Sequence, residues 1–251
     1  MLFYVWIREK VRATKDLDLL GLGNPSEQHL KRIIIETGKI KTYNDGLVFD
    51  KESIRIEDIR EENKYPGLRI HLMALLGNSR IPLQIDVGYG DSIEPKPEEI
   101  RYPVILEMPK PKLLAYTRES AIAEKFEAMV ELGVINSRMK DYYNIYYLSN
   151  YFNFSGSILQ SAIQSTFKRR GTNIPEIIPA GLSDDFCKTA EVQFRWKGFL
   201  KRLGLKDVTS DFYIIVSEIR KFLLPVVSEI NNNDFPKTRW SFEKREWLPV
   251  D

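Results

Sequence analysis

Two aspartates lie one residue apart in the stretch TKDLDLLG, inside an otherwise apolar run. Asp16 and Asp18 alternate with leucines, and this period of two predicts a β-strand. Side chains two residues apart in a strand project to the same face, so the two carboxylates would lie together. They repel each other unless a positive group separates them, and a divalent cation such as Mg²⁺ meets that need. By spacing alone, a strand edge with two solvated acids is the more common explanation.

A third acid interrupts a later apolar run, IPLQIDVGYGD. This run also alternates, which predicts another strand. If that strand lies beside the first in a matching register, the carboxylate of Asp86 joins those of Asp16 and Asp18. Three acids on adjacent strands could hold two metal ions, which activate an attacking oxygen and stabilise a departing pyrophosphate.

The elements that would position these acids follow from the hydrophobic periodicity. The first half alternates with period two in several stretches that are separated by brief turns, which favours a largely antiparallel or mixed sheet over a doubly wound fold. A helix with a Pro-Ser start and a glycine stop lies between the first of these stretches and the later ones. The predicted strands are 16–20, 46–59, 68–77 and 81–91.

From residue 118 the period changes to that of amphipathic helices. We therefore expect an α+β fold, in which a mixed sheet with flanking helices is followed by an all-helical bundle. The expected domains are 1–152 and 153–251, with the last residues forming a docked or loose extension. The predicted helices of the second half are 118–133, 137–152, 155–171, 183–203 and 209–230.

Composition excludes several classes of protein. The 37 basic and 35 acidic residues give a formal charge of +2, so any nucleic-acid site must be a local patch. The single cysteine, Cys187, cannot form an internal disulfide, and no Cys/His cluster has zinc spacing. The apolar start is too short for a signal peptide, and no run reaches the ~20 residues of a membrane span. We expect a cytoplasmic protein without membrane contact.

Other features have ordinary structural explanations. The sequence GLGNPS lacks the third glycine of a dinucleotide fingerprint, and we expect His29 and His71 to be structural. The densest basic stretches are 167–171 and 195–206, the second with Trp196 and Phe199 interleaved. A solvated helix face is the default explanation for them, and contact with a nucleic-acid backbone is the alternative.

Five separated motifs stand in the sequence in the order RATKDLDLLG, IDVGYGD followed by EP, YPVIL, AEKFEAM and NSRMKDYYNIYYL. Together they resemble the AbiEii/AbiGii toxin family, over roughly residues 1–155. Members of that family are minimal nucleotidyltransferases of the DNA polymerase β-like superfamily and act as toxins of type IV abortive-infection systems. The helical remainder resembles the family only in general character.

The resemblance implies a nucleotidyltransferase fold in the first domain and a role for each motif residue. Asp16 and Asp18 match the paired metal-binding carboxylates, and Asp86 matches the third acid. The implied cofactor is Mg²⁺ or Mn²⁺, with a nucleoside triphosphate as substrate. The implied partners are an acceptor RNA, tRNA at its 3′ end, and a cognate antitoxin protein.

Two further motifs contribute basic residues and one acid. Lys125 matches a lysine that contacts the triphosphate, and Asp141, with Arg138 beside it, matches the aspartate of the last motif. Asp141, on a neighbouring helix, could orient that lysine or a metal-bound water. Arg12 could touch phosphate, although a solvated loop arginine is nearly as common. Without the resemblance, an ordinary surface lysine and a helix ion pair would explain Lys125 and Asp141 equally well.

One feature of the family is missing. Its members usually carry a glycine and a small residue or serine upstream of the segment that matches LFYVW, and this pair binds the triphosphate. Here the sequence begins at Met1, inside that segment. Either the start is truncated or the protein binds nucleotide poorly. The function expected is transfer of a nucleoside monophosphate to an acceptor hydroxyl, and the alternative is a degenerate transferase that serves as a protein- or RNA-binding scaffold.

Overall fold

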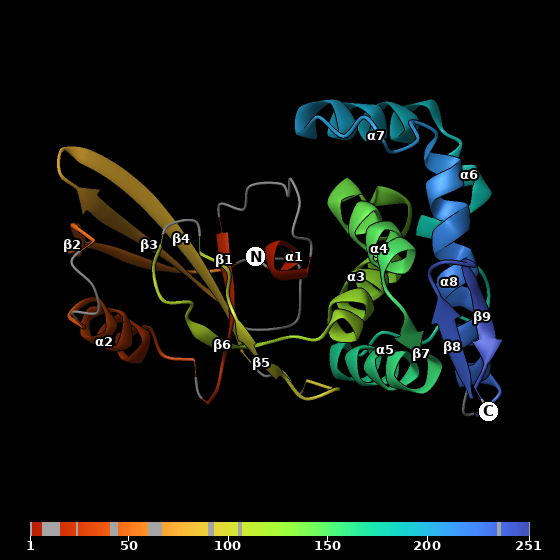
Figure 1. Ribbon diagram of the computed structural model, residues 1–251, viewed down its shortest axis with the longest axis horizontal. Helices are drawn as coiled ribbons and strands as arrows, with labels where there is room; N and C mark the ends of the chain where they lie inside the picture. Colours follow the sequence, from red (N-terminus) through yellow and green to blue (C-terminus); the bar gives the residue numbers. More distant parts are fainter. Residues whose placement is uncertain are drawn as a thin grey trace. The chain divides into compact units, whose positions relative to one another are not determined.

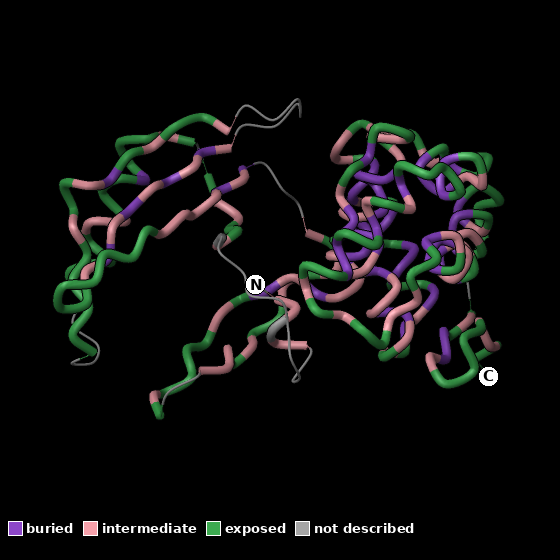
Figure 2. Tube along the Cα trace, turned by 90° about the horizontal axis from the view of Figure 1, so that it is seen from above, coloured by how far each residue is buried: buried purple, intermediate pink, exposed green. Residues whose placement is uncertain are grey.

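The computed structural model of this 251-residue chain describes residues 2–6, 16–23, 25–40, 45–59, 67–89, 93–104, 107–234 and 237–250, and at Tyr4 and Asp16 the backbone only. The chain divides into two compact units, Met1–Asp91 and Ser92–Asp251. The first is built around a sheet and the second mainly around helices (Figure 1). Buried residues follow the strands of the first unit and the helices of the second (Figure 2).

Four strands form the sheet of the first unit, in the order β1-β4-β3-β2. β1 runs parallel to β4, whereas β3 is antiparallel to both of its neighbours. The sheet is therefore mixed, as the sequence predicts. The strands are β1 (Asp16–Gly21), β2 (Leu47–Asp58), β3 (Gly67–Leu76) and β4 (Ser79–Tyr89).

One face of this sheet is apolar and carries the helix α2 (Glu27–Gly38) (Figure 1). The helix begins where the sequence predicts, because the Ser26 hydroxyl accepts a hydrogen bond from the backbone N–H of His29 at 3.3 Å. Leu30 of α2 is buried together with alternate residues of β3, such as Ile70. The residues between them, including Arg69 and His71, project from the opposite face, which is polar at this end of the sheet. A short helix, α1 (Phe3–Trp6), also belongs to this unit.

Helices dominate the second unit, and aromatic side chains form much of its core. Phe126 of α3 packs on Phe167 of α5 at 5.3 Å between ring centroids, and Tyr142 of α4 packs on Phe212 of α8 at 4.9 Å. The predicted 183–203 helix is split by Lys188 and Thr189, and Thr189 caps the second piece. The helices are α3 (Arg118–Leu132), η1 (Gly133–Ile135), α4 (Met139–Tyr151), α5 (Gly156–Arg170), η2 (Ala180–Leu182), α6 (Asp184–Cys187), α7 (Ala190–Leu203) and α8 (Phe212–Asn231).

The second unit also contains five short strands. The part of the chain that was predicted to be an all-helical bundle therefore contains strands as well as helices. β5 (Glu98–Arg101) pairs with β6 (Lys112–Ala115), and β7 (Phe154–Ser155), β8 (Thr238–Ser241) and β9 (Glu246–Pro249) form a separate sheet. The C-terminal residues 238–249 are thus docked on the helices. The indole of Trp240 is buried and donates to the Ser149 carbonyl at 2.6 Å, and Trp247 stacks on Phe222 at 5.7 Å.

The boundary between the two compact units lies at residue 91, earlier in the sequence than the predicted domain boundary at 152. α3 and α4 belong to the second unit because their buried faces supply aromatic partners to α5 and α8. The domain boundary at 152 remains a prediction. Within the described part of the chain, no helix combines the length and the apolar character that crossing a bilayer requires.

Candidate catalytic site

The parallel pairing of β1 with β4 decides where the acids of the first unit lie. Asp18 is the direct partner of Asp86, and Asp16 is the partner of Gln84. Residues paired in this way share one face of the sheet, and a slip of one residue would turn Asp18 to the other face. The backbone positions of Asp16, Asp18 and Asp86 therefore lie together on the polar face. Asp18 is exposed, and the side chain of Asp86 is largely buried.

Asp86 is held by two neighbours that the sequence analysis did not single out. Arg69, its antiparallel partner on β3, donates to both carboxylate oxygens at 2.8 Å from Nε and Nη2. The Gln84 amide lies 3.3 and 3.4 Å from the same two oxygens. The Arg69 guanidinium outweighs the effect of burial and lowers the pKa of Asp86 below its ordinary 3.8, so this carboxylate is ionised at neutral pH.

A signal for Arg69 was present in the sequence. In the stretch LRIHLM, Arg69 and His71 alternate with apolar residues, a pattern that places both side chains on the non-core face of a strand. What the sequence lacked was the strand pairing, which places Arg69 opposite Asp86 and His71 opposite Gln84. The His71 ring lies 3.1 Å from a Glu57 oxygen on the neighbouring strand. Nothing in this contact gives His71 more than a structural role.

The donor chemistry of the three acids suits Mg²⁺, which proteins bind through one or two carboxylates together with substrate phosphates. Among the described side chains, no group of three or more His, Cys, Asp or Glu is close enough to hold a metal ion. The side chain of Asp16 lies outside that description. Asp18 is exposed, whereas both oxygens of Asp86 are bound by Arg69.

The second unit brings together the two residues predicted from the later motifs. Lys125 on α3 donates from Nζ to Oδ1 of Asp141 on α4 at 3.0 Å. The Asp141 side chain is buried, while that of Lys125 remains 24% exposed. Asp141 also lies in the first turn of α4, where the positive end of the helix dipole favours a carboxylate. The ammonium group is therefore fixed in direction and still reachable from solvent.

The two predicted arginines have different outcomes. Arg138 is the residue before α4, half-buried, and its backbone N–H donates to the Asn136 side-chain oxygen at 2.8 Å. It therefore lies three residues before Asp141 at the start of the same helix. Arg12 lies outside the described residues.

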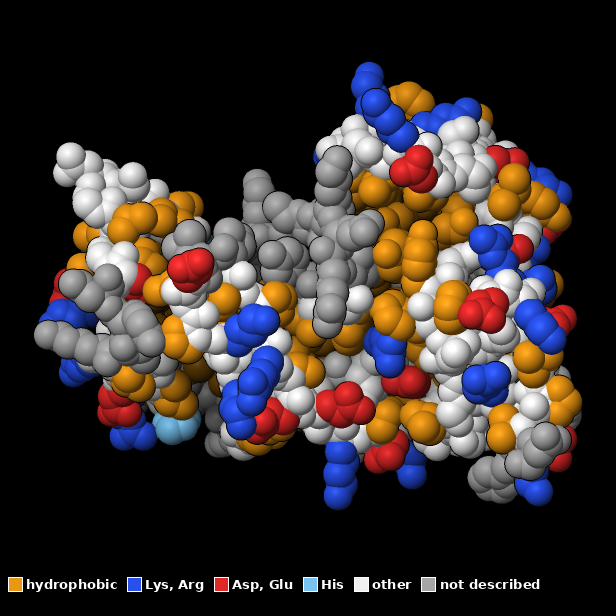
Figure 3. Space-filling model, in the orientation of Figure 1, with side chains coloured by type: hydrophobic (Ala, Val, Ile, Leu, Met, Phe, Trp, Pro, Cys, Tyr) orange, Lys and Arg blue, Asp and Glu red, His pale blue; other side chains and the backbone are white. Residues whose placement is uncertain are grey.

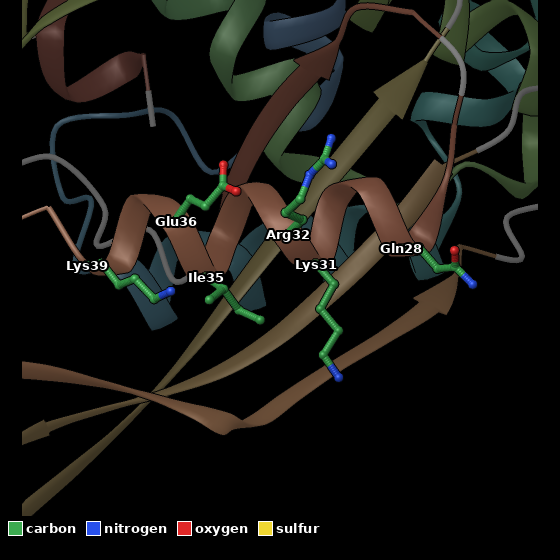
Figure 4. A pocket seen from close by; sticks show the side chains of 6 residues that line it. All are labelled: Gln28, Lys31, Arg32, Ile35, Glu36 and Lys39. Atoms are coloured by element: carbon green, nitrogen blue, oxygen red, sulfur yellow. The ribbon is translucent and has the colours of Figure 1, made fainter.

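Two open hollows occur on the described surface, and none of these predicted site residues lines either of them. One runs along α2, and its lining residues come from that helix and from Lys39, which directly follows it (Figure 4). The other lies beside α7 and the start of α8. The first is lined by Gln28, Lys31, Arg32, Ile35, Glu36 and Lys39, and the second by Lys188, Gln193, Lys197, Ser210, Asp211 and Tyr213.

Carboxylates on adjacent strands suit a divalent cation, and a lysine ammonium is a common ligand of phosphate. A family model described as "Nucleotidyl transferase AbiEii toxin, Type IV TA system" matches residues 1–221. The chain therefore belongs to the AbiEii family of nucleotidyltransferase toxins. This match confirms the resemblance found in the sequence. The chain therefore has the nucleotidyltransferase fold of that family.

Solved structures add a distant likeness. A proposed nucleotidyltransferase from H. pylori is 15% identical, with 90% of this chain and 85% of that chain covered and a TM-score of 0.41. JHP933 from Helicobacter pylori is 14% identical, with 92% and 85% covered and a TM-score of 0.39. Among curated proteins, no match was found.

Proposed function

We propose that this protein transfers a nucleoside monophosphate from a nucleoside triphosphate to an acceptor hydroxyl, at the 3′ end of a tRNA, and acts as a toxin. The observation that carries the proposal is the register of β1 and β4, which sets Asp18 directly beside Asp86 on one face. Membership of the AbiEii family supplies the reaction class and implies an antitoxin partner.

The acids of the first unit have a common role in this proposal. Asp16, Asp18 and Asp86 would hold Mg²⁺ or Mn²⁺, and the cation would neutralise charge that develops on the triphosphate. Because the pKa of Asp86 is lowered, this side chain remains a carboxylate at neutral pH. A carboxylate with a low pKa is a weak base, so Asp86 would hold the cation, and the proton of the attacking hydroxyl would pass to solvent water.

The basic residues would bind the phosphates. Lys125 supplies a point charge for the triphosphate, and its ion pair with Asp141 fixes the direction of that charge. Arg138 and Arg12 are further candidates for phosphate contact. In this arrangement positioning and charge neutralisation supply the catalysis, as in other phosphoryl transfers.

A second candidate function is a scaffold that has lost transferase activity. The bidentate ion pair between Arg69 and Asp86 favours it, because both oxygens of the third acid are already bound. In an active enzyme, Arg69 must release at least one of these oxygens. Alternatively, Arg69 keeps both hydrogen bonds and the cation binds the remaining lone pairs of the Asp86 carboxylate.

The test is a transfer assay with labelled nucleoside triphosphates, Mg²⁺ and total tRNA. We expect label on RNA with the intact chain and a loss of at least about 100-fold with Asp18→Asn or Asp86→Asn, because charge neutralisation at the transferred phosphate is lost. The control is Asp207→Asn, which removes the same charge from an exposed position in the second unit. If the intact chain transfers no label to any RNA or protein acceptor, the scaffold is the correct function.

A further inference from the structure

The outward side of α7 combines an exposed aromatic ring with a cluster of positive charges. Phe194 is 76% exposed, more than any other phenylalanine among the described residues. Arg195, Lys197, Lys201 and Arg202 follow on the same helix, and Lys and Arg side chains gather over α7 in the space-filling view (Figure 3). We call Phe194 and these four residues the α7 outer face.

The aromatic residue of α7 that is exposed is not one of the two that the basic stretch in the sequence suggested. Trp196 and Phe199, the rings interleaved with the basic residues in the sequence, are buried and stack on each other at 5.4 Å. The Trp196 indole N–H also donates to the Thr209 carbonyl at 2.9 Å. Phe194, two positions before Trp196, projects away from that core because of the helical period.

The charge of this surface is not neutralised locally. Arg195 pairs with Glu191 on the preceding turn. Among the described residues, no acidic group forms an ion pair with Lys197, Lys201 or Arg202, and all three are exposed. The three uncompensated cations therefore give the surface a net positive charge, which complements a polyanion.

The surface also has room for close approach to the helix. Apart from the adjacent residues and the backbone of α7 itself, no heavy atom lies within 4 Å of the position that a Cβ at Gly198 would take, so the space over this part of the helix is open. Gly198 lies one turn after Phe194 and one turn before Arg202. A flat base could therefore lie against the Phe194 ring while its phosphate reaches the cations of the last turns of α7.

We propose that the α7 outer face binds a single-stranded stretch of RNA, with Phe194 stacked on an unpaired base and Lys201 and Arg202 on the phosphates. The proposal rests on the proposed function, because it says where the acceptor RNA is held. Stacking on one aromatic ring with nearby cations is the usual way to bind single-stranded nucleic acid. A protein partner would be expected to cover a broader apolar surface with fewer unpaired cations.

The helix is also linked to the predicted site residues of its own unit. Phe199 on the inner side of α7 contacts Tyr143 of α4 at 5.8 Å between ring centroids. Asp141, the partner of Lys125, lies two residues before Tyr143 on α4. RNA bound on α7 would therefore be held by the same packed helices that fix the Lys125 ammonium.

The test measures RNA binding apart from transfer. Fluorescence anisotropy would follow the binding of a labelled tRNA and of a labelled 12-nucleotide single strand, a length of about the site size of such proteins. We expect Phe194→Ala to weaken binding about tenfold with little change in salt dependence. We expect Lys201→Glu/Arg202→Glu to lower the slope of log affinity against log salt concentration by about 1.4, for two lost phosphate contacts.

Matched controls separate this surface from general effects. Leu114→Ala removes a side chain that is 77% exposed in the same unit, and Lys237→Glu/Lys244→Glu makes the same charge change on exposed lysines of the C-terminal segment. Both controls should bind RNA as the intact chain does. Circular dichroism should show all variants folded, because the substituted side chains are exposed.

The outcomes distinguish this proposal from the proposed function. If both α7 variants bind RNA as tightly as the controls, the α7 proposal is wrong, even where transfer to RNA is observed. If they bind the antitoxin less tightly but RNA normally, the surface belongs to a protein partner and the RNA proposal is also wrong. Weakened RNA binding in a chain that transfers no nucleotide would support the surface and reject the transferase.

Discussion

At the scale of single residues, the charge state of the candidate site depends on Arg69. Its guanidinium donates to both oxygens of Asp86, and Gln84 adds a weaker contact on the same side. Burial alone would raise the pKa of Asp86, so the net lowering shows that the ion pair is the larger effect. The residue types of Asp16, Asp18 and Asp86 could be predicted to do metal chemistry from the sequence, whereas the control of one acid by Arg69 could not.

The substitution Arg69→Met tests this control. We expect the pKa of Asp86 to rise, since the favourable ion pair is lost and the effect of burial remains. Carbon-detected NMR titration of the Asp86 carboxyl group in the intact chain and the variant measures the change. Arg80→Met, which removes an exposed arginine from β4, should leave the pKa of Asp86 unaltered. An equal pKa in the intact chain and in Arg69→Met would show that the ion pair is absent in solution.

The same ion pair has a consequence for stability. A carboxyl group whose pKa is lower in the folded state stabilises the fold at pH values above its ordinary 3.8, and this contribution is lost as the pH falls through the lowered pKa. The difference in unfolding free energy between the intact chain and Arg69→Met should therefore shrink as the pH falls below about 4.

At the scale of elements, close contacts at the short helix η2 connect α3 and α4 in the second unit. Gly181 in η2 has no room for a side chain, because a Cβ there would lie 2.6 Å from the Met129 carbonyl oxygen of α3. Its own carbonyl accepts a hydrogen bond from the Tyr142 hydroxyl of α4 at 2.8 Å. The helices α3 and α4 that carry Lys125 and Asp141 are thus joined through one glycine.

Two glycine substitutions should have opposite effects. Gly181→Ala is expected to lower the free energy of unfolding by about 1–3 kcal/mol, because the added methyl group overlaps backbone atoms. Gly198→Ala is expected to raise it by about 0.5–1 kcal/mol, because alanine suits a helix interior and the space is open. Urea unfolding followed by circular dichroism measures both. A neutral Gly181→Ala would mean that η2 and α3 separate at little cost.

At the scale of the whole molecule, the chain is organised as two compact units, and the first ends at residue 91. Most of the large fully buried side chains lie in the second unit, among them Trp196, Trp240 and Phe212. The helical pattern in the sequence begins at residue 118, but the boundary between the two units lies before it, at residue 91. The physical reason is that α3 and α4 share one core with the later helices.

Two fragments test where the boundary lies. A chain of residues 92–251 should unfold cooperatively, because it keeps the contacts of Phe126 with Phe167 and of Tyr142 with Phe212. A chain of residues 153–251 loses both contacts and the Ser149 partner of Trp240, so it should show no cooperative transition. Tryptophan fluorescence in urea measures both. Cooperative unfolding of the shorter fragment would instead place an independent domain after residue 152.

Local patterns in the sequence determined the elements and part of the chemistry. The period of two set Asp16 and Asp18 on one face of β1, and capping residues such as Ser26 marked a helix end. These features depend on residues a few positions apart, so they can be recognised without the fold.

Only the tertiary structure decided which distant residues meet. The parallel pairing of β1 with β4 and the position of Arg69 opposite Asp86 join segments far apart in the sequence. The docking of the C-terminal strands on α8 is of the same kind. Such contacts depend on how the chain closes around its core, because many registers and pairings satisfy the same local pattern and only packing selects one of them.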